Sequence, residues 1–294
     1  MGKINGIYAA SVSILDKALN LDIDKTIKHA ENLITQGCHG VVIFGSTGQA
    51  QLISSSEKIK LVEKLSKSKC KNKFIIGTGF NSLKESLLFL QVCKNFNFKN
   101  FLIMPPAYYN YEDSDVINFY SQIIKQHPWC QIILYNFEKL SGYKFSIECV
   151  EELVKKYPDQ IIGIKDSSYN LYKNLKLKNF SIFPGSELKL ISGLELGCSG
   201  IITATCNITA ELSRNIYDDF ISKKKQFQIE KLCNVREAFD KFNLISGIHT
   251  FLSSSDNSYT NLLPPLSLLS KDNKKKLLDE LTKLDFNYNF LKIN

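Results

Sequence analysis

Short apolar runs rich in β-branched residues alternate along the chain with longer segments whose apolar residues recur every three or four positions. The short runs predict buried strands, and the longer segments predict amphipathic helices. Strands are predicted at residues 6–11, 40–45, 73–78, 100–104, 130–136, 161–165, 180–184 and 199–203. Helices are predicted between them at residues 23–36, 54–67, 83–95, 114–127 and 147–157.

This alternation predicts an α/β protein whose parallel strands are joined by crossover helices. Eight such repeats favour a closed (β/α)8 TIM barrel, which we place in residues 1–206. A doubly wound open sheet is the alternative. The Gly-x-Gly-x-x-Gly fingerprint of dinucleotide-binding sheets is absent, however, and residues 77–82 only begin like one.

The strand pattern stops after about residue 206. Residues 207–294 are expected to form the last barrel helix and a C-terminal helical extension, packed on the barrel as part of a single structural unit. Pro264 and Pro265 interrupt the helical pattern, and a last helix is predicted from about Lys271.

Composition excludes several classes of protein. With 44% hydrophobic and 22% charged residues, the 294-residue chain fits a soluble globular protein. No apolar run is long enough to span a bilayer, and residues 1–7 lack the pattern of a signal peptide, so we expect a cytoplasmic protein without a membrane partner. The net charge of +8 comes from scattered lysines, and the only arginines are Arg214 and Arg236, which disfavours nucleic acid as a partner.

The cysteines and histidines do not indicate a metal site. The eight cysteines contain no Cys-x-x-Cys pair, and the four histidines are isolated from one another. Neither a zinc site nor a histidine-based catalytic triad is therefore predicted.

Polar side chains follow most of the predicted strands, and barrel enzymes place their active sites at the carboxyl ends of the strands. The residues at these ends are Gly45, Ser46, Thr47, Gly48, Tyr108, Tyr109, Asn110, Tyr135, Asn136, Lys165, Asp166, Ser167, Gly185, Ser186, Glu187 and residues 203–207. Some have plain structural explanations, since Gly-Ser-Thr-Gly is typical of a tight turn and Glu187 suits the first turn of a helix.

Lys165 is the hardest of these residues to explain structurally, because it ends a run that contains Ile161, Ile162 and Ile164. Burial disfavours the ammonium form, so we expect a neutral amine that can attack a ketone or aldehyde. The resulting iminium is an electron sink that stabilises a carbanion on the adjacent carbon. Such covalent catalysis makes or breaks a carbon–carbon bond.

Two other elements complete this chemistry. The phenol of Tyr135, polarised by Ser46 or Thr47, is expected to move protons to and from the substrate. The turn from Gly45 to Gly48 offers amide and hydroxyl donors for the carboxylate of a 2-oxo acid.

With these residues, the chain resembles the dihydrodipicolinate synthase and N-acetylneuraminate lyase family of pyruvate-dependent class I aldolases. The resemblance runs nearly end to end and rests on five motifs: residues 45–48 (Gly-Ser-Thr-Gly), 107–110 (Ala-Tyr-Tyr-Asn), 135–136 (Tyr-Asn), 163–168 (Gly-Ile-Lys-Asp-Ser-Ser) and 185–187 (Gly-Ser-Glu). It implies a homotetramer built from tight dimers, in which Tyr109 reaches into the neighbouring subunit's site. It also implies that pyruvate binds covalently and that no metal or organic cofactor is needed.

Departures from the family pattern bear on the substrate. Glu138 stands at the position of a proline, and Leu140 at that of an arginine which in synthases binds the aldehyde's carboxylate. Losing that contact is expected to cost about 1.5–3 kcal/mol, which disfavours synthase activity. Because Arg214 and Arg236 lie beyond the last strand, neither is expected to replace it at the barrel mouth. Residues 140–142 (Leu-Ser-Gly) are similar to those of sialic-acid lyases, although Leu188 stands where lyases tend to carry a second acidic residue.

The leading hypothesis is a lyase that cleaves or condenses pyruvate with an aldehyde, acting on a 2-keto-3-deoxy sugar acid or an N-acetylneuraminate-like substrate. The expected roles are nucleophile for Lys165, proton shuttle for Tyr135, relay and carboxylate site for Ser46, Thr47 and Tyr109, and aldehyde-side wall for Leu140, Ser167 and Glu187. Further residues expected to bind the substrate are Gly45, Gly48, Gly185, Ser186 and Ile202. Two alternatives stay open: 4-hydroxy-tetrahydrodipicolinate synthase, and a catalytically silent barrel that binds a 2-oxo acid. Tyr169, which replaces a common glycine of the family, and Glu138 motivate the silent barrel.

Overall fold

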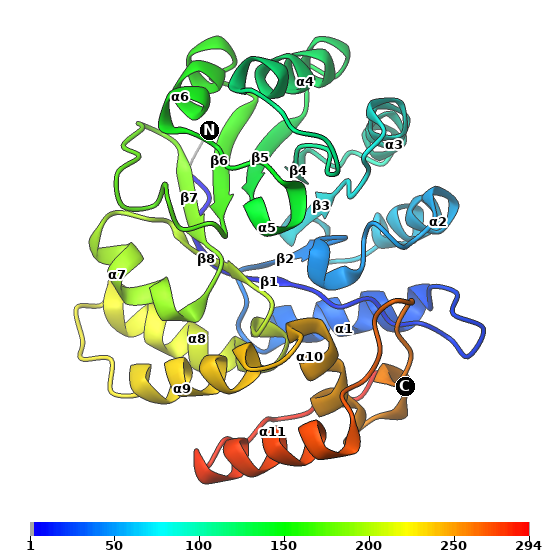
Figure 1. The fold of residues 1–294 in the computed structure, drawn as a ribbon, viewed down its shortest axis with the longest axis vertical. Helices are drawn as coiled ribbons and strands as arrows, with labels where there is room; N and C mark the ends of the chain where they lie inside the picture. Colours follow the sequence, from blue (N-terminus) through cyan, green and yellow to red (C-terminus); the bar gives the residue numbers. More distant parts are fainter. Residues whose placement is uncertain (1–2, 294) are drawn as a thin grey trace.

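The computed structural model describes residues 3–293 and shows eight parallel strands surrounded by helices, as predicted (Figure 1). The strands are β1 (Gly6–Ala10), β2 (Gly40–Ile43), β3 (Phe74–Gly77), β4 (Asn100–Ile103), β5 (Gln131–Asn136), β6 (Ile161–Asp166), β7 (Ser181–Pro184) and β8 (Gly200–Thr203). Their order is β7-β6-β5-β4-β3-β2-β1-β8, so each strand pairs with its neighbour in sequence and β1 pairs with β8.

The pairing of β1 with β8 makes the sheet a nearly closed barrel rather than an open sheet. Gly6 lies opposite Gly200, and a Cβ atom on Gly200 would lie only 1.9 Å from the carbonyl oxygen of Gly6. Between β7 and β8, the N–H of Ser199 donates to the carbonyl of Ile182 at 2.8 Å. The prediction of a (β/α)8 barrel is thus confirmed, and the open-sheet alternative is wrong.

The helices that cover the barrel are α1 (Ile23–Thr35), α2 (Ser55–Leu65), α3 (Leu83–Asn95), α4 (Asp113–Gln126), α5 (Glu138–Ser141), α6 (Ile147–Lys156), α7 (Leu190–Glu195) and α8 (Cys206–Ile221). Short 3-10 turns are η1 (Ser46–Gly48), η2 (Lys71–Lys73), η3 (Glu187–Lys189) and η4 (Asn257–Tyr259). Serine side chains at positions 54, 82 and 146 cap α2, α3 and α6 by accepting from the backbone N–H three residues later.

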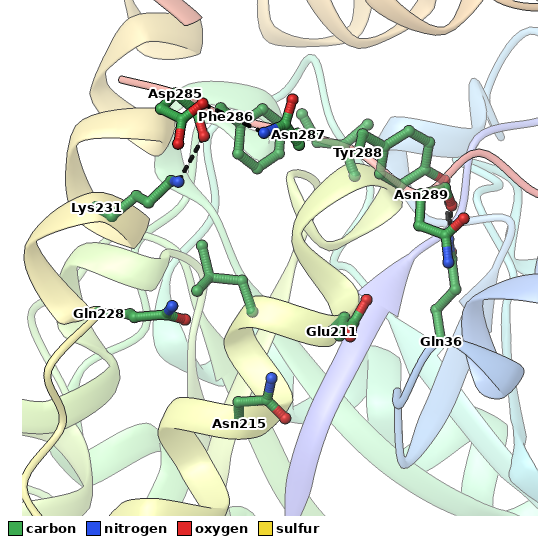
Figure 2. Close-up of a pocket in the computed structure, with 12 residues that line it drawn as sticks. Gln36, Glu211, Asn215, Gln228, Lys231, Asp285, Phe286, Asn287, Tyr288 and Asn289 are labelled. Carbon is green, nitrogen blue, oxygen red and sulfur yellow. Dashed lines mark hydrogen bonds between the residues drawn. The ribbon is translucent and has the colours of Figure 1, made fainter. Parts of the chain in front are cut away.

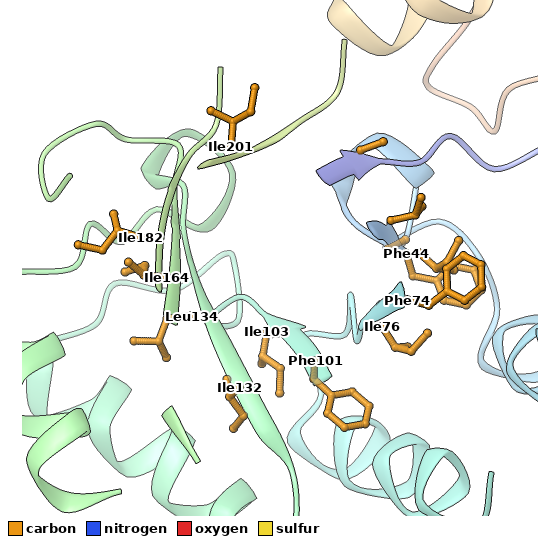
Figure 3. Packing of buried hydrophobic residues seen from close by; sticks show 14 of the residues in the cluster. Phe44, Phe74, Ile76, Phe101, Ile103, Ile132, Leu134, Ile164, Ile182 and Ile201 are labelled. Atoms are coloured by element: carbon orange, nitrogen blue, oxygen red, sulfur yellow. The ribbon is translucent and has the colours of Figure 1, made fainter. Parts of the chain in front are cut away.

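Two layers of apolar side chains result from the alternation of residues along the strands. Outward-facing residues such as Phe101, Ile132, Leu134 and Ile164 pack against the helices (Figure 3). Inward-facing residues form a separate cluster of Tyr8, Ala10, Val42, Ile75, Leu102, Met104, Ile133, Tyr135, Phe183 and Ile202. Side chains therefore fill the interior of the barrel.

The remaining helices are α9 (Ile229–Asp240), α10 (Leu244–Ser253) and α11 (Lys271–Lys283), with no strand after β8 in the described residues. They lie together beside α1 and α8 (Figure 1). A second core joins them to the barrel, since Phe239, Ile248 and Leu277 pack with Val12 and Ile208. Within residues 3–293, none of the helices combines the length and apolarity needed to cross a membrane.

Candidate active site

A cavity of about 630 Å³ opens at the carboxyl ends of the strands. Six of the predicted site residues line it, namely Ser46, Thr47, Tyr135, Lys165, Ser167 and Gly185. They come from the ends of β2, β5, β6 and β7. β5, β6 and β7 are neighbours in the barrel, and β3 and β4 separate β2 from β5. The parallel topology therefore gathers them at one rim.

An irregularity in β6 turns Lys165 into the barrel. Ile161 lies opposite Ile132 of β5, but the next pair is Gly163 with Ile133, so Ile162 is an extra residue. Because successive side chains of a strand point to opposite faces, this bulge reverses the direction of every later side chain. Ile161 packs in the outer layer. If every residue from Ile161 to Lys165 were paired regularly, Lys165 would point outward as well.

Lys165, Tyr135 and Ser46 form a continuous polar chain. Lys165 is only 4% exposed, and its Nζ donates to the Tyr135 hydroxyl at 3.3 Å. That hydroxyl lies 2.9 Å from the Ser46 Oγ. A nucleophilic amine, a phenol and a hydroxyl are thus aligned in the order that proton transfer during Schiff-base formation requires.

The turn that carries Ser46 is held rigidly. The N–H of Gly48 donates to the carbonyl of Gly45 at 3.0 Å, and the Ser13 hydroxyl donates to the carbonyl of Gly48 at 2.7 Å. A Cβ on Gly48 would lie 2.9 Å from the carbonyl oxygen of Ser11, so a larger residue would push the turn away from β1. Gly45 and Gly48 shape the turn and do not themselves line the cavity.

Asp166, next to Lys165, fastens the following loop. It is fully buried and accepts from the Asn136 side chain at 2.8 Å and from the backbone N–H of Tyr169 at 3.0 Å. Tyr169 has a φ of 60°, the left-handed conformation that favours glycine. The loop thus keeps a glycine-like backbone while the Tyr169 ring lines the cavity.

Several expected residues do not line this cavity. Leu140 is 41% exposed on α5, Tyr109 is 68% exposed and packs edge to face with Tyr108, and Ile202 is buried in the barrel interior. Ser186 caps η3 by accepting from the N–H of Leu188. The cavity of a single chain therefore gives no support for placing these four residues in the substrate-binding site or in the proton relay.

Glu187 also points away from the cavity, into a buried polar network. It accepts hydrogen bonds from Thr203 at 2.8 Å, Thr205 at 2.5 Å and Thr209 at 3.1 Å, and from the guanidinium of Arg236 at 3.1 Å. It occupies the first position of η3, as its structural explanation predicted.

An arginine does lie at the barrel mouth, although both arginines come after the last strand in sequence. Arg236 and Asp240, one turn apart on α9, line the cavity together with Phe242, which precedes α10, and Leu244 at the start of α10. This position alone does not assign Arg236 the role of the synthase arginine. The packing of α9 over the mouth is a long-range feature that local patterns do not reveal. The sequence feature that could have indicated this pair is the i, i+4 spacing of Arg236 and Asp240, because arginine is rare in this chain.

A second cavity lies on the outside of the barrel, between α8, α9 and the C-terminal segment (Figure 2). The Lys231 Nζ donates to the carbonyl of Asp285 at 2.5 Å, and the Gln36 amide donates to that of Asn289 at 2.6 Å. These polar groups fasten the C-terminal segment to the barrel.

A parallel barrel whose mouth holds a buried amine beside a phenol defines a class of enzyme that can carry a ketone substrate on lysine. The chain belongs to the Dihydrodipicolinate synthetase family, whose model matches residues 3–284. Members of this family are pyruvate-dependent class I lyases, and the protein is an enzyme of this class.

Its relatives carry different activities. The 4-hydroxy-tetrahydrodipicolinate synthase of Karelsulcia muelleri is 29% identical over 298 residues, which cover 95% of this chain and 97% of the relative. N-acetylneuraminate lyase 2 of Escherichia coli O6:H1 is 26% identical over 260 residues, or 85% and 84% of the two chains. A variant of the 2-keto-3-deoxygluconate aldolase of Sulfolobus solfataricus shares the fold, with a TM-score of 0.84 and 20% identity over 95% of this chain and 96% of that structure.

Proposed function

We propose that the protein is a Schiff-base aldolase that cleaves a 4-hydroxy-2-oxo acid, such as a 2-keto-3-deoxy sugar acid or an N-acetylneuraminate-like acid, into pyruvate and an aldehyde, or catalyses the reverse condensation. The observation that carries the proposal is the chain from Lys165 through Tyr135 to Ser46 in a cavity at the barrel mouth. The membership of the family supports it.

The proposed reaction starts with attack of the Lys165 amine on the 2-oxo carbon of the substrate. Tyr135 supplies the proton with which the carbinolamine loses water, leaving an iminium and a phenolate. The phenolate then takes the proton from the C4 hydroxyl as the C3–C4 bond breaks, which releases the aldehyde and leaves an enamine. Protonation at C3 and hydrolysis return the free amine and pyruvate. The iminium is the electron sink, so the proposal assigns no step to a metal or organic cofactor.

Three groups are proposed to hold the substrate's carboxylate and support Tyr135. Thr47 is buried beside the cavity, and Ser46 contacts the Tyr135 hydroxyl. Tyr109 is proposed to act across a subunit interface, because its ring lies exposed beside the still more exposed Tyr108. This proposal includes assembly as a dimer of dimers.

Reduction with borohydride tests the proposed function. Incubation with pyruvate and borohydride should add a stable pyruvate-derived mass to the peptide that contains Lys165. Lys58 provides a matched control, because it is also buried but lies outside the cavity. The adduct should persist in Lys58→Met and disappear in Lys165→Arg; failure of the unmodified protein to form it would reject the proposal.

A panel assay separates the remaining functions. Pyruvate release from 2-keto-3-deoxygluconate or N-acetylneuraminate would identify the substrate class. Consumption of aspartate semialdehyde with pyruvate would instead support synthase activity, which the apolar Leu140 at the arginine position of synthases does not favour. Adduct formation without turnover of any substrate would support a silent 2-oxo-acid-binding barrel.

A further inference from the structure

Arg236 lines the cavity that contains Lys165. It is only 7% exposed. Its Nε donates to Asp240 at 2.9 Å, and its Nη1 donates to Glu187 at 3.1 Å and to Thr203 at 3.0 Å. Within residues 3–293, Nη2 has no hydrogen-bond partner. Because Arg236 lines the cavity and most of its side chain is buried, this free donor indicates a ligand group that accepts from it.

Glu187 fixes the direction in which this donor points. The carboxylate is fully buried, and three threonine hydroxyls hold it in addition to Arg236. Because both carboxylate oxygens are engaged, the guanidinium cannot rotate without breaking a buried network. Such a network orients the group that it supports.

The local charge selects the kind of ligand. The single positive charge of Arg236 is already matched by Glu187 and exceeded once Asp240 is counted. Among the other charged groups near this wall, Glu138 pairs with Lys144 at 3.3 Å, Lys139 lines the cavity, and the Nζ of Lys189 lies 6.0 Å from the centre of the Tyr169 ring. Directly beside Asp240, a phosphate or carboxylate would face a like charge, whereas a hydroxyl group can accept from Nη2 and donate to Asp240.

Tyr169 adds a third group to this side of the cavity. Burial raises the pKa of its phenol, while the nearby charge of Arg236 lowers it. Because the shift is upward, the phenol stays protonated at neutral pH and can donate. Arg236, Asp240 and Tyr169 thus offer the cavity two donors and one acceptor.

We propose that Arg236, Asp240 and Tyr169 bind the hydroxyl groups of the aldehyde-derived part of the substrate and select neutral polyhydroxy aldehydes over anionic ones. In this arrangement Glu187 is a positioning residue that acts through Arg236. The inference rests on the proposed function, because it concerns the second substrate of the same site.

The test compares condensation of pyruvate with D-glyceraldehyde, D-glyceraldehyde 3-phosphate and aspartate semialdehyde by the full-length protein. The unphosphorylated aldehyde should be preferred. Asp240→Asn should raise the KM for D-glyceraldehyde about tenfold, since a hydrogen bond to a charged group is lost, and leave kcat and the KM for pyruvate within about twofold. The same variant should improve the use of D-glyceraldehyde 3-phosphate.

Two further variants separate binding from folding. Asp218→Asn is the matched control, because Arg214 and Asp218 form the same i, i+4 contact, at 2.7 Å, on α8 and outside the cavity. It should change no kinetic constant. Glu187→Gln should raise the KM for D-glyceraldehyde without changing the KM for pyruvate, whereas a purely structural role would alter both.

The outcomes are distinct from those of the adduct experiment. Failure of Lys165 to form the pyruvate adduct removes the proposed function as a whole. If the adduct forms, three results would overturn the present inference alone. They are an unchanged KM for D-glyceraldehyde in Asp240→Asn, a preference for the phosphorylated aldehyde, and no turnover of any of the three aldehydes.

Discussion

Lys165 lies directly opposite Tyr135 in the register of β6 and β5, and its Nζ sits 3.3 Å from the Tyr135 hydroxyl and 4.3 Å from the centre of the ring. The proposed nucleophile and the proposed proton shuttle are thus register partners on adjacent strands. Backbone hydrogen bonds of the sheet, rather than flexible loops, set their separation. Such placement keeps the two groups aligned through the several proton transfers of the proposed reaction.

Tyr135→Phe tests the proton shuttle. The variant keeps the ring in the barrel interior but loses the hydroxyl, so turnover should fall by about 10²–10⁴-fold, as is typical for loss of a general acid–base group. The amine of Lys165 remains, and the borohydride adduct with pyruvate should still form, although more slowly. Measurement of kcat and of the rate of adduct formation checks both expectations; unchanged kcat would remove Tyr135 from the proton path.

Ser46→Ala tests the relay. Loss of its contact with Tyr135 should cost roughly 1 kcal/mol, which corresponds to about a fivefold decrease in kcat. Ser199→Ala is the control, because this hydroxyl is also buried but has no hydrogen-bond partner in the described structure and does not line the cavity. Equal effects of the two substitutions on kcat would contradict the relay.

Lys58 should make stability depend on pH. Its Nζ is buried, donates to the carbonyl of Thr78 at 2.8 Å and lies 3.7 Å from the ring centre of Phe80. Burial lowers the pKa of Lys58 from 10.5 to about 7, and Glu85 opposes the shift. Between these two pH values the unfolded chain holds a proton that the folded chain has lost. The free energy of unfolding should therefore rise with pH in this window, by up to about 1.4 kcal/mol per pH unit from this group.

Urea denaturation at pH 7, 8 and 9 measures that slope. Lys58→Met should lose the contribution, so that the difference in stability between the variant and the unmodified protein changes steadily with pH. Lys60→Met serves as the control, since Lys60 lies on the same helix but is exposed. Parallel pH profiles for Lys58→Met and the unmodified protein would show that the buried amine stays charged.

Tyr109 should act on a neighbouring subunit. Tyr109→Ala and Lys165→Ala should each be nearly inactive alone, because each site would lack one required group. Mixing the two variants under conditions that permit subunit exchange should restore activity, since some sites then combine Lys165 of one subunit with Tyr109 of another. Measurement of turnover before and after mixing checks this, and failure to recover despite demonstrated exchange would place Tyr109 outside the catalytic site.

Most of the fold could be predicted from the sequence because it follows from local patterns. Each of the eight strands lies within two residues of its predicted position, and α11 begins at Lys271 as expected. β2 is shorter than predicted because Phe44, with a φ of 60°, turns the chain out of the extended conformation. The predicted residues at the strand ends meet at one rim because the strands are parallel.

The far wall of the cavity could not be predicted, because it depends on tertiary packing. Arg236 and Asp240 reach the mouth only through the docking of α9, which apolar contacts such as those of Val235 and Phe239 determine. Glu187 resembles a pocket residue by its position after β7, yet hydroxyl groups of α8 and the end of β8 draw it inward. Sequence spacing places a residue at an edge but does not decide which way a flexible side chain turns.

The extra residue in β6 decides which side of the barrel the motif around Lys165 faces. If Ile162 were paired regularly instead of being bulged out, Lys165 would point outward like Ile161 and away from Tyr135. Deleting Ile162 would remove the bulge but keep the pairs Gly163–Ile133 and Lys165–Tyr135, so the amine would stay inside the barrel. The same motif letters can thus face either side of a sheet, and the pairing of the strand, not the motif alone, places the amine.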